Sequence, residues 1–280
     1  MKKMNMGFKA IVAGFVVAGL GCAKTSSGAM ASASLAMTGS SQPASLTASY
    51  KNSNPLLQFL SPMAVALAPP AMMDSSGRTV MLTKSWIVVK EIEFKLDEVA
   101  GSSEIDSSEI KFRGPYVVDL LSSIPASFGA TSMPAGVYRR IKMKLEKVSA
   151  LPAGAPNELM GKSIFLQGTV GGVQFSYTSE DGTEFKISGP GGVNISDTAN
   201  LVVGIKVADL FKKINLSGIT ANTLISDTNR VTASTPCVSI DASAADLYTC
   251  FRKGLEQAGK FGKDSNNNGE IEVGEDEVKD

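Results

Sequence analysis

The chain has 280 residues, of which 43% are hydrophobic and 19% are charged, so it can bury a core and is not of disordered composition. Its 27 basic and 27 acidic side chains balance, and we therefore expect no nucleic-acid partner. Histidine is absent, which excludes Ser-His-Asp catalysis, Cys-His catalysis and histidine-bound zinc.

Residues 1–21 are predicted to be an export signal. Lys2, Lys3 and Lys9 precede a short apolar run at residues 11–21. A membrane-spanning helix needs roughly 20 apolar residues, so this run is too short to span and is typical of a signal peptide. Removal of the signal leaves a mature chain with a charge of −3, which does not favour a polybasic membrane binder.

The signal ends at Gly21-Cys22, and this junction resembles the lipobox of bacterial lipoproteins, although Gly19 stands where that family has Leu, Val or Ile. The resemblance implies acylation of Cys22 with palmitate-like chains and the lipid bilayer as a partner. Ala23, in place of the Asp that retains such proteins at the inner membrane, implies the outer membrane, on its periplasmic or cell-surface face. The alternative is ordinary secretion with cleavage after Ala31.

Residues 22–54 are rich in Ser, Ala and Thr and carry almost no charge, which predicts a flexible tether after the lipidated cysteine. Residues 55–78 form an apolar lead-in segment that several prolines interrupt. Residues 79–232 are predicted to form an antiparallel β-sandwich, which makes the fold mainly β.

The alternation of apolar and charged residues carries the strand predictions. Five apolar residues between 86 and 96 share one parity, and charged residues share the other from Glu91 onward, which is typical of a half-buried strand in an antiparallel sheet. The apolar positions are Trp86, Val88, Ile92, Phe94 and Leu96, and the charged ones are Glu91, Glu93 and Lys95. Gly171-Gly172 and Asp181-Gly182 each predict a hairpin, and residues 201–207 predict a buried strand that leads into a helical turn.

Residues 114–121, with the sequence GPYVVDLL, and residues 133–141, with the sequence MPAGVYRRI, resemble the DUF4382-type domain of exported bacterial proteins. The resemblance covers residues 80–210. It implies a β-sandwich outside the inner membrane and no known activity.

Residues 233–280 are predicted to form a disulfide-closed helix followed by a metal-binding loop. If Cys22 is acylated or removed, Cys237 and Cys250 remain as an even pair in an exported protein, which favours a disulfide worth about 3 kcal/mol. Two separate thiols are the alternative. Leu247, Phe251 and Leu255 recur at helical spacing.

Residues 264–275, with the sequence DSNNNGEIEVGE, resemble the EF-hand calcium loop. Calcium prefers six to eight oxygen ligands, and the loop places its oxygen donors at the expected positions, with Gly269 at the sharp sixth position. The candidate ligands are Asp264, Asn266, Asn268, the carbonyl of Glu270, Glu272 and Glu275. We expect weak binding, with Kd in the range of roughly 10⁻⁴–10⁻³ M of extracellular modules. The alternative is a solvated acidic tail.

These features favour a non-enzymatic binding or structural role in the cell envelope. One alternative is an envelope hydrolase that uses carboxylates of the sheet such as Glu91 and Glu93, and another is a calcium-dependent surface adhesin. The basic residues from Arg139 to Lys147 are expected to be an ordinary solvated sheet face, and binding of an anionic polymer or lipid phosphate is the alternative.

Overall fold

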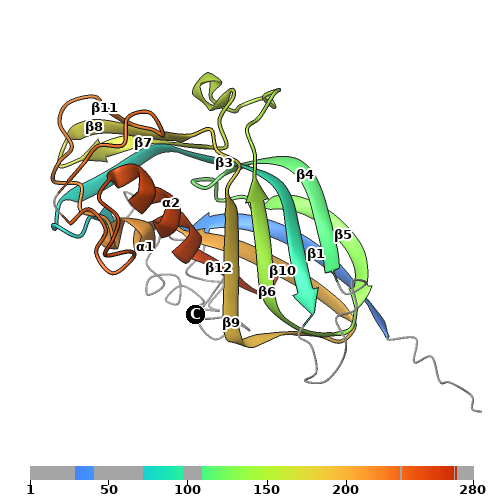
Figure 1. Ribbon diagram of the computed structural model, residues 1–280. Helices are drawn as coiled ribbons and strands as arrows, with labels where there is room; N and C mark the ends of the chain where they lie inside the picture. The colour runs from blue at the N-terminus through green and yellow to red at the C-terminus, as the bar shows by residue number, and fades with distance from the viewer. Residues whose placement is uncertain (1–28, 41–71, 97–108, 234, 268, 270–280) are drawn as a thin grey trace, which may run out of the picture.

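The computed structural model describes residues 29–40, 72–96, 109–233, 235–267 and 269, and strands dominate them, which confirms the mainly β prediction (Figure 1). The strands are β1 (Met30–Ser40), β2 (Met72–Met73), β3 (Thr79–Leu96), β4 (Glu109–Asp119), β5 (Ala126–Pro134), β6 (Gly136–Leu145), β7 (Ile164–Val170), β8 (Val173–Ser179), β9 (Glu184–Ile195), β10 (Thr198–Lys206), β11 (Thr223–Ile225) and β12 (Gly259–Lys263). The helices described are α1 (Val207–Lys212), α2 (Leu247–Gln257) and the short 3₁₀ turn η3 (Asn157–Leu159).

The strands form two sheets. The smaller sheet has the order β12-β10-β1-β5, and the larger one has the order β11-β8-β7-β3-β6-β9, with β2 and β4 also paired to β3. Most pairs are antiparallel, but β1 pairs with β10 and β8 pairs with β11 in parallel. The sheets are therefore mixed, and the prediction of a purely antiparallel arrangement is wrong in these two places.

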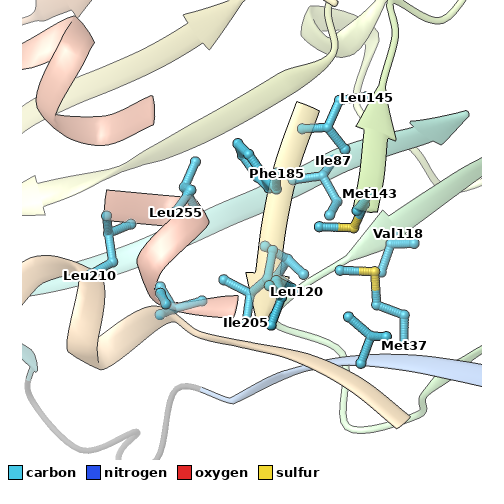
Figure 2. Close-up of a cluster of buried hydrophobic side chains, with 14 of the residues drawn as sticks. Met37, Ile87, Val118, Leu120, Met143, Leu145, Phe185, Ile205, Leu210 and Leu255 are labelled. Atoms are coloured by element: carbon cyan, nitrogen blue, oxygen red, sulfur yellow. The ribbon is translucent and has the colours of Figure 1, made fainter. Parts of the chain in front are cut away.

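The two sheets enclose one main core. Met37 and Ile205 from the smaller sheet lie across from Ile87, Met143 and Phe185 of the larger sheet (Figure 2). Apolar side chains of this kind contribute about 1.5–3 kcal/mol each when they are fully buried. Leu210 of α1 and Leu255 of α2 extend the same core at one end, where both helices lie.

Residues 30–40, which we expected to be part of a flexible tether, instead form β1 in the middle of the smaller sheet. Leu35 pairs with Leu201 of β10, and Ala33 pairs with Thr131 of β5. Leu35 is only 1% exposed. The reason is a period-two pattern built from small residues, in which alanines, Leu35 and a methionine alternate with polar side chains. The remaining tether residues lie outside the described ranges.

A β-bulge at Lys90 changes which side chains of β3 face the core. Register shifts between Val89 and Glu91 occur against both neighbouring strands, β4 and β6. An extra residue reverses the parity of a strand. Ile92 and Phe94 face the main core as predicted, but Trp86 and Val88 face outward. They contribute to a second, smaller cluster whose other buried members are Val148, Leu159 and Phe165.

Of the two predicted hairpins, one is confirmed. Gly171 and Gly172 have φ of 56° and 82° and connect the paired strands β7 and β8. The hairpin predicted at Asp181-Gly182 is wrong, because β9 pairs with β6 at the other end of the larger sheet. The Asp181-Gly182 turn therefore ends β8 without pairing it to the next strand: β8 pairs with β7, and β9 pairs with β6.

The C-terminal part belongs to the same structure and not to a separate unit. Phe261 of β12 pairs with Val203 of β10, and its ring lies 5.2 Å from that of Phe94 in the opposite sheet. Helix α2 packs against α1 and β9. The boundary predicted at residue 232 therefore does not separate two cores.

Candidate metal centre

Strand β12 positions the start of the predicted calcium loop. Its last ladder pair joins Lys263 to Leu201, and the backbone amide of Asp264 then donates a hydrogen bond of 2.8 Å to the carbonyl of Asn200. The sequence predicts a helix and then the loop, but it does not predict this intervening strand. The loop consequently begins at a fixed point on the sheet.

The chain curls back on itself between Asp264 and Gly269, as its described residues 264–267 and 269 show. The side chain of Asp264 is buried, and its Oδ2 accepts a hydrogen bond of 2.8 Å from the backbone amide of Gly269. Asn267 and Gly269 have φ of 59° and 74°, the left-handed conformation that Asn and Gly adopt most readily. The first and sixth positions of the loop are therefore in contact, as a closed ligand loop requires.

Two contacts outside the loop hold this curl against the protein. A Cβ atom on Gly269 would lie 2.1 Å from Cγ of Pro125, so the glycine allows the loop to pack on the segment before β5. The side-chain amide of Asn200 donates to Oδ1 of Asn267, and its own Oδ1 accepts from the hydroxyl of Ser34 on β1. Pro125, Asn200 and Ser34 were not predicted as part of the site, because no local signal brings residues so distant in sequence together.

The six predicted ligands fall into two groups. The structure describes Asp264, which is buried, and Asn266, which is exposed. The remaining four, Asn268, Glu270, Glu272 and Glu275, lie outside the described residues. Within the described ranges, no group of three Cys, Asp or Glu side chains is placed to hold a metal ion. The donors present are hard oxygens on a closed curl, and this chemistry fits calcium.

Cys237 and Cys250 form the disulfide that the sequence predicts, with Cα atoms 5.3 Å apart. Cys250 lies in α2, and the residue before this helix, Asp246, accepts a hydrogen bond of 2.7 Å from the amide of Thr249 through its side chain. This N-cap satisfies one of the free amides of the first turn. The disulfide attaches α2 to the preceding segment, and Cys22 lies outside the described residues.

Glu91 and Glu93, the candidate acid–base pair, are held in ion pairs. Glu91 lies 2.8 Å from the ammonium of Lys144, and this hydrogen bond lowers the pKa of its carboxyl. Burial opposes ionisation of Glu93, but the hydrogen bond from Lys111 and the charges of Lys111, Lys142 and Lys144 outweigh it and lower its pKa too. A general acid at neutral pH needs a raised pKa. The pair therefore does not favour the hydrolase alternative.

Comparisons with protein-family models, with curated proteins and with solved structures find no match to this chain. The resemblances to bacterial lipoproteins, to the DUF4382-type domain and to the EF-hand loop thus stay predictions. No helix in the part of the chain that the structure describes has both the length and the apolar character needed to cross a membrane.

Proposed function

We propose that this chain is an exported protein of the bacterial envelope, anchored in the outer membrane through acylated Cys22, whose C-terminal loop binds calcium. Its role is binding or structural and not catalytic. The observation that carries the calcium proposal is the contact between the buried carboxylate of Asp264 and the amide of Gly269. That contact closes the first half of the loop, within a sequence that supplies the other predicted oxygen donors.

Electrostatics also supports a cation at this loop. Residues 264–280 contain seven acidic side chains and one lysine, a local charge of −6. Like charges so close together repel one another, and a bound divalent cation relieves this repulsion while it satisfies the oxygen ligands. A solvated acidic tail would not need the left-handed Asn267 or the packing of Gly269 on Pro125.

The position of β1 supports cleavage before Cys22 over cleavage after Ala31. The carbonyl of Ala29 accepts a hydrogen bond of 2.7 Å from the amide of Ala135, and Ala31 is only 2% exposed. Cleavage after Ala31 would remove these contacts from the sheet. Cleavage before Cys22 leaves β1 whole.

Calorimetric titration with calcium tests the loop, with Glu275→Gln as the variant and Glu277→Gln as a matched control on the same acidic segment. We expect heat of binding for the wild type and for Glu277→Gln, and none for Glu275→Gln. At a calcium concentration of 100 times Kd, the wild type should gain about 2.7 kcal/mol in its free energy of unfolding. Equal behaviour of the two variants, or no heat in the wild type, refutes calcium binding.

Metabolic labelling with palmitate tests the anchor, with Cys22→Ala as the control. We expect label in the wild type and none in the variant. Protease treatment of whole cells then distinguishes the periplasmic from the cell-surface face. Secreted wild-type protein without label refutes the anchor and leaves the calcium proposal standing.

A further inference from the structure

The outer face of β4, β3, β6 and β9 carries a regular grid of charged side chains, which we call the basic face. Residues of alternate parity on these strands point away from the core, and the strand register places them in three rows. The rows are Arg113-Glu91-Lys144-Glu184, Lys111-Glu93-Lys142-Lys186 and Glu109-Lys95-Arg140.

The carboxylates of β3 neutralise one half of this grid. Glu93 is 3% exposed and lies 3.3 Å from the ammonium of Lys111, 3.5 Å from that of Lys142 and 3.6 Å from that of Lys144. Glu91 pairs with Lys144 and Arg113. These ion pairs involve both cations of the grid on β4, Lys111 and Arg113, and two of its three cations on β6, Lys142 and Lys144.

The half of the grid nearer β9 holds like charges directly opposite each other. Lys142 of β6 is the register partner of Lys186 of β9, and among the described residues each has a single carboxylate at a longer distance, Glu93 at 3.5 Å from Lys142 and Glu184 at 3.6 Å from Lys186. Like charges in such positions destabilise a sheet. The guanidinium of Arg140 is exposed and makes no hydrogen bond or ion pair to the residues that the structure describes. An exposed guanidinium that forms no ion pair with the described residues, on a strand next to the Lys142–Lys186 pair, is favourable next to an anion.

The basic face has seven cations and four carboxylates, a net charge of +3. The chain as a whole is neutral, and residues 264–280 alone carry −6. A chain that is neutral in total thus carries a local excess of positive charge on this face. The overall charge of the mature chain therefore does not describe the surface that a partner meets.

We propose that the basic face binds the anionic headgroups of a lipid bilayer. The choice of lipid over other polyanions rests on the anchor at Cys22 proposed above. Only residues 23–29 separate Cys22 from β1, and seven residues span at most about 25 Å. Ala29 is bonded to Ala135, at the turn from which β6 leads to Arg140. A lipid anchor at Cys22 would therefore lie near the start of β6, the strand that carries Arg140.

Vesicle co-sedimentation tests this surface without the anchor. The probe protein is the chain of residues 22–280 with Cys22→Ser, which cannot be acylated; none of the described contacts involves a residue before Ala29. We expect it to bind vesicles of phosphatidylcholine with phosphatidylglycerol, not vesicles of phosphatidylcholine alone, and to be released by salt.

Paired variants locate the binding surface. Arg140→Gln with Lys186→Gln should weaken binding about 30-fold, or about fivefold for each cation removed. Lys84→Gln with Lys212→Gln removes the same charge from outside the grid, where both lysines sit in exposed ion pairs, and should leave binding within about twofold of the wild type. Circular dichroism confirms that both double variants fold.

Three results would overturn the proposal: equal binding to both vesicle types, equal loss in the two double variants, or retention on an anionic polysaccharide resin without vesicle binding. The anchor is judged separately by palmitate labelling. Vesicle binding by a chain that takes up no palmitate in cells supports the basic face and refutes the anchor.

Discussion

The backbone amide of Gly269 donates a hydrogen bond to the carboxylate of Asp264, and Cα of the same glycine faces Pro125 so closely that a methyl group does not fit. One residue thus closes the loop and packs it on the protein. Because φ is 74° and the space is filled, Gly269→Ala should lower the free energy of unfolding by about 1–3 kcal/mol and weaken calcium binding.

Gly77→Ala is the matched control for this substitution. Gly77 also has a left-handed φ, 83°, but nothing lies within 4 Å of the added Cβ. It should lose only about 1 kcal/mol in urea unfolding and keep its calcium heat. If Gly269→Ala loses no more stability than Gly77→Ala, the loop does not pack on Pro125.

The ion pairs of Glu93 predict a specific pH dependence of stability. Its pKa in the folded state is lowered, so it contributes stability that is fully present above its ordinary pKa of 4.5 and is lost as the pH falls through the folded value. At pH 7, Glu93→Gln should cost about 1.5–3 kcal/mol, because three lysines lose their shared carboxylate. Once the pH falls below the folded pKa of Glu93, the difference from the wild type should vanish, since protonated Glu and Gln are both neutral.

Urea unfolding over a pH series measures this effect. Glu184→Gln is the control, because its carboxylate is more exposed and lies 3.6 Å from Lys186. It should change the stability by less than about 0.5 kcal/mol at every pH. A Glu93→Gln penalty that is constant with pH would show that the cost is steric and not electrostatic.

The aromatic contact between the two sheets can be measured by a double-mutant cycle. Phe94→Ala should cost about 3–5 kcal/mol, and its coupling energy with Phe261→Ala should be about 0.5–1.5 kcal/mol. Trp86→Ala, on the other side of the Lys90 bulge, should be additive with Phe261→Ala within about 0.5 kcal/mol. Coupling between Trp86 and Phe261 would place the bulge elsewhere and refute the parity change.

The disulfide should stabilise the region around α2. Its cysteines are 13 positions apart, and closing a loop of that size is worth about 3 kcal/mol. The double variant Cys237→Ser/Cys250→Ser should therefore show a lower Tm in thermal unfolding. Dithiothreitol should lower the Tm of the wild type similarly and leave the variant unchanged. A reducing agent without effect on the wild type would show that the bond does not form in solution.

Local patterns predicted several elements well. The alternation at Ile92 and Phe94, the turn at Gly171-Gly172 and the strand before α1 all appear in the structure, because each depends on side chains within a few residues. Strand β1 was missed because its alanines and serines are also the composition of a linker. Burial of Leu35 by partners far along the chain decides its structure, and no local window contains those partners.

In the candidate site, too, some features could be predicted from the local sequence and others could not. The order of oxygen donors and the role of Gly269 were readable from spacing alone. The contributions of Asn200, Ser34 and Pro125 were not, because they arise from pairing among β1, β10 and β12. The charge pattern of the basic face was not predictable for a related reason: a balanced total charge does not reveal a register that places Lys142 beside Lys186.

The place of β1 also constrains how the chain acquires its structure. It is the first of the described strands to be synthesised, yet its two partners, β5 and β10, follow roughly 90 and 165 residues later. Until β5 emerges this segment has no partner strand, and until β10 emerges one of its edges stays unpaired and open to aggregation. The smaller sheet therefore cannot be completed until nearly the whole chain has been synthesised, because β10 and β12 lie in its last third.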